Sequence, residues 1–72
     1  MLKTELQSFV DKFLTDYPES SIEEITQEVY AISKEQSYDR VMSSVVALIY
    51  DLLDRNKLTQ NFNSTIPVFS IV

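Results

Sequence analysis

Apolar residues recur at helical spacing in three segments of the chain, and this pattern predicts three helices. In residues 2–16 the apolar positions form one stripe, while most of the charged residues fall on the other side. The first helix should end at Tyr17, because a residue that precedes a proline is pushed out of the α region, and Pro18 follows. The stripe, which we expect to lie in the core, consists of Leu2, Leu6, Phe9, Val10, Phe13 and Leu14.

The second helix should begin at Ser20 or Ser21. Each serine has a glutamate three residues later, Glu23 or Glu24, and this spacing fits a capping box. In such a box the serine hydroxyl accepts a backbone N–H, and the carboxylate reaches back to the N–H of the serine. The apolar face of this helix continues to about Ser33.

The third helix should be the central one. The polar break at residues 34–37 ends in Ser37, which is a good N-cap, although Ser43 or Ser44 offers an alternative start. From there to about residue 55, apolar residues cover more than one stripe of the helix. A helix this apolar is expected to be packed on two sides.

The last fifteen residues carry no charge and predict a β-hairpin. The expected strands are residues 57–60 and 66–72, joined by turn-forming residues 61–65. Pro67 cannot donate a ladder hydrogen bond, so we expect an edge strand at that position. Because the chain has no glycine, Asn56 is expected to end the third helix in a left-handed conformation. The predicted fold class is therefore mainly α, with three helices and a C-terminal β-hairpin or wing.

The composition limits the chemistry that the chain can perform. The chain has 72 residues, the size of one domain, and it contains no cysteine, histidine or glycine. Disulfides, thiolate metal sites and histidine bases are therefore excluded, and so are glycine-rich phosphate loops. We expect no enzyme activity, cofactor, metal or small-molecule substrate. Because packing alone must hold so small a fold, we expect a homodimer.

No segment of the sequence resembles a membrane anchor. The first residues lack the uninterrupted apolar core of a signal peptide, and the longest apolar run, residues 45–50, is six residues long. A membrane span requires about 18 apolar residues, so we expect a cytoplasmic protein with no membrane partner.

The acidic residues are concentrated in the first half of the chain. Residues 1–36 hold eight acids and three bases, residues 37–57 hold three of each, and the rest hold none, which accounts for the net charge of −5. Because affinity for phosphate backbones comes from Lys and Arg, an acidic chain binds nucleic acid poorly. We expect carboxylate pairs such as Glu24 and Glu28 to be solvated, whereas catalytic pairs need burial.

Residues 43–58 combine several features of a helix followed by a wing. They begin with the small polar residues Ser43 and Ser44, continue with apolar residues at helical spacing, and end in a basic-Asn-basic stop before Leu58. Together with the order of three helices and a hairpin, this stretch resembles the winged helix-turn-helix superfamily. The resemblance implies a dimeric DNA-binding transcription regulator whose third helix enters the major groove. It implies nucleic-acid contacts by Ser37, Tyr38, Arg40, Ser43, Ser44, Arg55 and Lys57, with the Arg40 guanidinium suited to guanine.

The uncharged tail leaves a second function open. Winged-helix DNA binders commonly grip phosphate with Lys or Arg in the wing, and residues 58–72 contain neither. The alternative is an acidic protein-interaction module, such as a phage-type inhibitor or an adaptor. This module would bind a protein partner through the first two helices or through the hairpin edge. The hairpin residues expected at this protein interface are Phe62, Ile66, Val68, Phe69 and Ile71.

Overall fold

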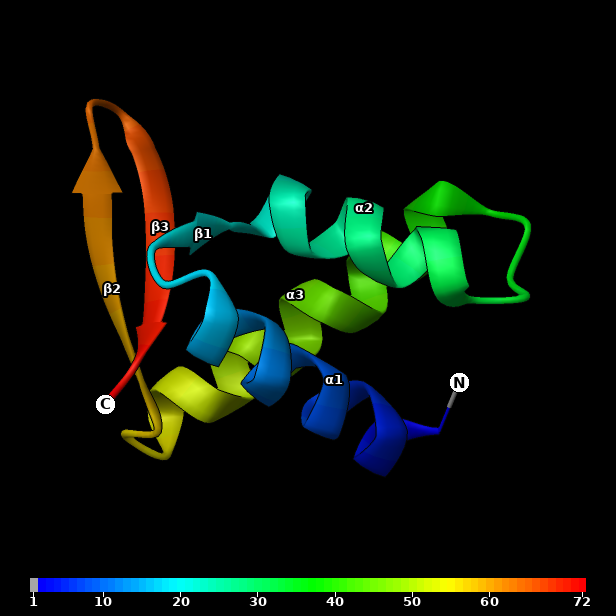
Figure 1. The fold of residues 1–72 in the computed structure, drawn as a ribbon, viewed down its shortest axis with the longest axis horizontal. Coiled ribbons are helices and arrows are strands. Elements are labelled where there is room, and N and C mark those ends of the chain that lie inside the picture. The colour runs from blue at the N-terminus through cyan, green and yellow to red at the C-terminus, as the bar shows by residue number, and fades with distance from the viewer. Residues whose placement is uncertain (1) are drawn as a thin grey trace.

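The computed structural model describes residues 2–72, which form three helices and a small antiparallel sheet. Figure 1 shows the sheet at one end of the molecule, with the three helices extending away from it. The predicted fold class, mainly α with three helices and a C-terminal β-hairpin, is confirmed. The elements are α1 (Lys3–Asp16), β1 (Ser20–Ser21), α2 (Ile22–Ile32), α3 (Tyr38–Asp54), β2 (Leu58–Asn63) and β3 (Ile66–Ile71).

Side-chain caps fix where α2 and α3 begin. Of the two capping boxes that the sequence allows, the one that forms joins Ser21 and Glu24. The Glu24 N–H donates to the Ser21 hydroxyl at 3.2 Å, and the Ser21 N–H donates to Glu24 Oε1 at 3.2 Å. At the start of α3, the Ser37 hydroxyl accepts the Arg40 N–H at 3.4 Å. The third helix therefore begins at the earlier of its two expected starts.

The end of α3 is stabilised without a glycine. Asn56 has a φ of 58°, so the predicted left-handed terminator is confirmed. The Asn56 N–H donates to the Leu53 carbonyl at 3.0 Å, and the Lys57 N–H donates to the Leu52 carbonyl at 2.9 Å. This pair of bonds is the Schellman arrangement, which satisfies carbonyls that a helix end would otherwise leave open. The chain then turns directly into β2.

The sheet has a third strand that the sequence did not predict. Its strand order is β1-β3-β2, so the short β1 lies beside the C-terminal strand, far away along the chain. In this pairing Ser20 lies opposite Phe69, and Ser21 lies opposite Val68. Two serines carry no strand signal of their own, and only the pairing with β3 makes them a strand.

β3 is the central strand of the sheet, between β1 and β2. At Pro67 it is nevertheless an edge on one side, as predicted, because β1 ends at Ser21, opposite Val68, and does not reach Pro67. The predicted turn is too long. β2 continues to Asn63, and the turn is reduced to two residues, of which Ser64 has a φ of 59°. The first three of the five expected turn residues therefore belong to a strand.

The core lies between α3, the other two helices and the sheet. As predicted, α3 is central, and it contributes more buried apolar side chains than either α1 or α2. The aromatic side chains of Phe9 and Phe13 differ from the prediction, because they are only partly buried and pack on the margin of the core. The largest fully buried side chains are Phe69, Leu14, Ile25, Ile49, Leu52, Val10, Val45 and Thr26.

Candidate functional site

The first two residues proposed to contact nucleic acid are engaged within the fold. The Ser37 hydroxyl caps α3, as described above, and the residue is half-buried. The Tyr38 ring packs edge-on against the Tyr30 ring, with centroids 5.5 Å apart. The Tyr30 hydroxyl in turn donates to the Gln36 carbonyl at 3.2 Å. These side chains hold the α2–α3 connection together and are not presented as a reading surface.

Arg40, Ser43 and Ser44 are exposed and lie on the outer face of α3. Helical spacing continues this face through Ala47 and Tyr50 to the acids Asp51 and Asp54. Arg40 also borders a small hollow of about 150 Å³ that Glu35 shares. The face that a winged helix would turn toward DNA therefore carries one cation at its beginning and two carboxylates at its end.

The remaining cations of the proposed nucleic-acid site lie at the far end of α3. A helix rises about 1.5 Å per residue, so Arg55 lies about 22 Å from Arg40 along the axis. Arg55 Nη2 contacts Asp51 Oδ2 at 2.6 Å, in an ion pair whose side chains are 45% and 41% exposed. Lys57 is exposed beside the start of β2. The structure does not bring the expected basic residues into one cluster.

The hairpin residues expected at a protein interface divide into two groups. Phe62, Ile66 and Ile71 are 61%, 55% and 41% exposed, and they offer apolar surface near the sheet. Val68 and Phe69 are 4% and 1% exposed. These two were wrongly expected on the surface. They lie in the middle of β3, where β1 pairs with it, whereas Ile66 and Ile71 lie at the two ends of the strand.

The outer edge of β2 carries no charged residue. The Val72 N–H donates to the Lys57 carbonyl at 3.2 Å, and antiparallel ladders alternate between bonded and non-bonded pairs. Lys57 and Val72 therefore form a hydrogen-bonded pair, and every second residue of β2 after Lys57 does the same. Gln60, three residues from Lys57, belongs to a non-bonded pair with Phe69, so its N–H and C=O point away from β3. The outward N–H of Phe62 donates to the Asn61 side chain at 2.9 Å. The backbone groups of Gln60 therefore face outward.

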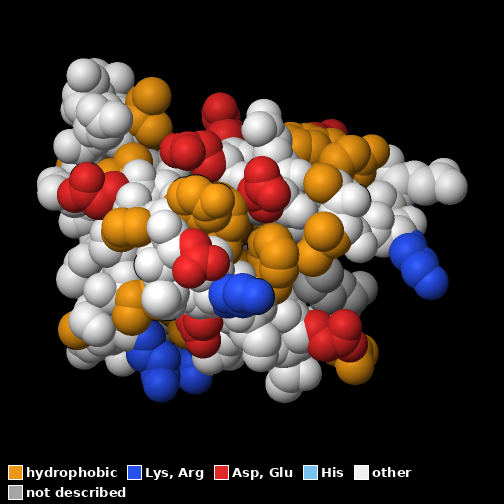
Figure 2. All heavy atoms as spheres, in the orientation of Figure 1, with side chains coloured by type: hydrophobic (Ala, Val, Ile, Leu, Met, Phe, Trp, Pro, Cys, Tyr) orange, Lys and Arg blue, Asp and Glu red, His pale blue; other side chains and the backbone are white. Residues whose placement is uncertain are grey.

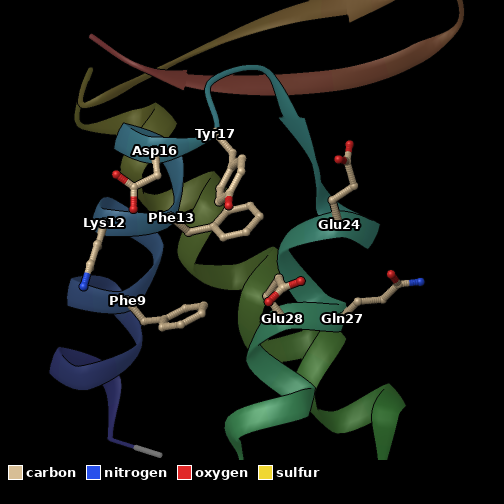
Figure 3. A pocket seen from close by; sticks show the side chains of 8 residues that line it. All are labelled: Phe9, Lys12, Phe13, Asp16, Tyr17, Glu24, Gln27 and Glu28. Atoms are coloured by element: carbon tan, nitrogen blue, oxygen red, sulfur yellow. The ribbon is translucent and has the colours of Figure 1, made fainter.

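A groove between α1 and α2 has a volume of about 570 Å³. One wall is a row of aromatic rings that project from α1 toward α2 (Figure 3). The Phe9 and Phe13 rings stack with centroids 6.3 Å apart, and the Phe13 and Tyr17 rings lie 5.2 Å apart. Spacing of four residues puts all three on one side of the helix. The groove is lined by Phe9, Lys12, Phe13, Asp16, Tyr17, Glu24, Gln27 and Glu28.

The polar lining of this groove is mainly acidic. The lining contains three acids and one cation, a formal charge of −2. The acids are Asp16, Glu24 and Glu28, and the cation is Lys12. The Glu28 side chain points from α2 toward the aromatic row (Figure 3). Figure 3 also shows that Lys12 and Asp16 both lie on the outer side of α1. Within residues 2–72 the one ion pair is Asp51 with Arg55, so these groove charges are not neutralised by contact. Figure 2 shows this arrangement as hydrophobic groups with acidic groups around them.

The residues of this groove were visible in the sequence but were interpreted differently. The sequence predicted Phe9 and Phe13 in the core, and it indicated no role for Gln27 and none for Tyr17 beyond ending the first helix. The available signal was the four-residue spacing of Phe9, Phe13 and Tyr17, which places three aromatic rings in a row along one side of the segment. The acidic residues of α2 are exposed, as expected.

The described part of the chain offers little for other kinds of site. In residues 2–72, no helix has the length and apolar content needed to cross a bilayer, and no three potential metal ligands cluster together. No family model, curated protein or solved structure matches this chain. Any functional conclusion must therefore come from the surfaces themselves.

Proposed function

We propose that this protein is a protein-interaction module that binds a partner through the groove between α1 and α2. The observation that carries the proposal is the row of partly exposed aromatic rings along that groove. Aromatic side chains are enriched at protein interfaces because they bury much area at a small cost in conformational entropy. Tyr17, at the end of the row, is 62% exposed and so is accessible to a partner.

The distribution of charge supports this proposal over DNA binding by α3. DNA affinity depends on cations that neutralise phosphates, and the resemblance to winged helices implicates α3 and the hairpin. The outer face of α3 has Arg40 at one end and Asp51 and Asp54 at the other. The hairpin strands contain no Lys or Arg. A duplex approaching this side would meet too few cations for a stable electrostatic contact.

A salt series with random duplex DNA separates the two functions. We expect no change in the fluorescence anisotropy of a labelled duplex, even at low salt, because the charge balance gives no net release of counterions. The control variant Arg40→Ala should behave like the wild type. Binding that weakens steeply with salt and is lost in Arg40→Ala would favour the DNA-binding regulator instead.

Partner capture tests the groove directly. The tagged chain is incubated with a nuclease-treated extract of the source cells, and retained proteins are compared between two variants. Tyr17→Ser shortens the aromatic row, while Tyr50→Ser removes a tyrosine of similar exposure from α3, at 62% and 53% respectively. We expect partners to be lost with Tyr17→Ser and kept with Tyr50→Ser. The opposite pattern would place the interface on α3 and reject the groove.

A further inference from the structure

We propose that the groove between α1 and α2 receives a basic amphipathic helix of the partner protein. This inference rests on the proposed function above and names the chemistry of the partner. Its starting point is the combination of an aromatic wall with the Glu28 carboxylate, unpaired within residues 2–72, in a groove whose lining is acidic overall. A ligand that fits both must offer apolar side chains and positive charge within the same short segment.

The length of the aromatic row matches the spacing of anchors on a helix. Tyr17 directly follows the end of α1 and is eight residues from Phe9, which corresponds to about 12 Å along the helix axis. A partner helix that places anchors at i, i+4 and i+7 or i+8 covers the same distance, so its apolar stripe can follow the row. Arg or Lys side chains beside this stripe can lie over the ring faces, where a cation is attracted to the π-system.

The carboxylates determine the sign of the charge that the partner must carry. Glu28 points toward the aromatic row, and the lining as a whole has three acids and one base. The Glu24 carboxylate already accepts the Ser21 N–H, so Glu28, which points toward the aromatic row, is the acid left to receive a partner cation (Figure 3). A polyanion such as nucleic acid, or an anionic membrane surface, would be repelled by this lining.

A second copy of this chain does not have the required chemistry. α1 contains the cations Lys3 and Lys12 beside three acids, α2 contains no Lys or Arg, and α3 contains only Arg40. Each helix therefore carries more acids than bases, and a copy placed in the groove would set like charges against each other. The occupant is a cationic helix of another protein.

Designed peptides test the charge of the partner helix separately from the existence of the binding site. Three peptides of about 18 residues, which is about five helical turns, share one apolar stripe and carry Lys and Arg, Gln, or Glu at the polar positions. A fourth has the basic composition with its apolar positions scrambled. Each is titrated into the isotopically labelled full chain, and amide resonances and affinity are followed. The basic amphipathic peptide should shift resonances of the groove and bind at least about tenfold more tightly than the others.

A matched pair of variants isolates the groove charge. Glu28→Lys reverses a carboxylate that lines the groove, and Glu23→Lys makes the same change on an exposed residue of α2 outside the lining. Both variants change the net charge by the same amount, so the long-range electrostatic effect on peptide binding is the same in both. We expect Glu28→Lys to weaken binding of the basic peptide about tenfold more than Glu23→Lys does. Circular dichroism checks that both variants are folded.

The outcomes distinguish a wrong partner from a wrong site. If the Gln peptide shifts the groove resonances as strongly as the basic peptide, the groove binds proteins but the inferred cationic partner is wrong. If the two variants have equal effects, the inferred cationic partner is also wrong. If the scrambled basic peptide binds equally, positive charge is sufficient and the inferred amphipathic helix is wrong. If the shifts fall on α3 or the hairpin, or if no peptide binds, the groove itself is wrong and the proposed function fails with it.

Discussion

Glu19 lies in the short connection between α1 and β1 with a φ of 62°, and replacing it with glycine should stabilise the fold. A left-handed backbone is unfavourable for a residue with a Cβ atom, which comes too close to the following carbonyl oxygen. The backbone N–H of Glu19 donates to the Ser70 hydroxyl at 3.1 Å, and Glu19→Gly keeps that donor. The side chain is exposed, so little packing is lost.

The expected gain from Glu19→Gly follows from two opposing terms. Removing the left-handed strain returns roughly 1–2 kcal/mol. The greater freedom of glycine in the unfolded chain costs about 0.5–1 kcal/mol. The net increase in the free energy of unfolding is therefore about 0–1.5 kcal/mol, and its midpoint of about 0.75 kcal/mol raises Tm by about 3–6 °C in a domain of this size.

Thermal unfolding followed by circular dichroism measures this gain, with Glu28→Gly as the matched control. Glu28 is an exposed residue inside α2, where glycine lowers stability by about 0.5–1 kcal/mol. Both variants remove one glutamate from a chain of net charge −5, so the shared charge effect cancels in the comparison. A Tm for Glu19→Gly at or below that of the wild type would refute the argument. The two variants shifting in the same direction would also refute it.

Three further predictions concern stability and assembly. Ser21→Ala removes the hydroxyl of the capping box and should lower the unfolding free energy by about 1 kcal/mol in denaturant titration, whereas the exposed Ser43→Ala should change it little. Thr26 Oγ1 is buried with no hydrogen-bond partner among residues 2–72, so Thr26→Val should stabilise the fold by about 1 kcal/mol, and a lower Tm would contradict this. The uncharged outer edge of β2 should allow weak dimerisation by strand pairing, and Gln60→Lys should reduce the dimer fraction measured by sedimentation velocity. A wild-type protein that stays monomeric at high concentration would be inconsistent with that pairing.

Features that depend on neighbouring residues were readable from the sequence. The three helices follow from apolar spacing, and their boundaries follow from residues that act within a few positions of each other. Ser21 and Glu24 form their capping box three residues apart, Ser37 caps α3 in the same way, and Asn56 ends α3 in a left-handed conformation. In each case the hydrogen bonds close within one turn of the chain, so sequence spacing reduces each helix boundary to a few candidate residues. The structure then selects Ser21 over Ser20, and Ser37 over the later serines.

Features that depend on distant segments required the tertiary structure. Ser20 and Ser21 form a strand only because β3 lies beside them, and this pairing makes β3 central and leaves Val68 and Phe69 buried. The groove between α1 and α2 is also a feature that depends on distant segments. A stripe of apolar residues on α1 predicts that one side of the helix is buried, but it does not say how wide the covering surface is.

The packing of α1 against its neighbours decides that width, and it leaves the margin of the stripe uncovered. Phe9 and Phe13 are therefore only partly buried, and with Tyr17 they form one wall of a groove whose opposite wall comes from α2. The sequence by itself determined which residues are apolar, which are acidic and where the helices lie. Only the tertiary structure decided which aromatic rings face the acids of α2, because that juxtaposition depends on the angle and distance between two helices and not on the sequence of either one.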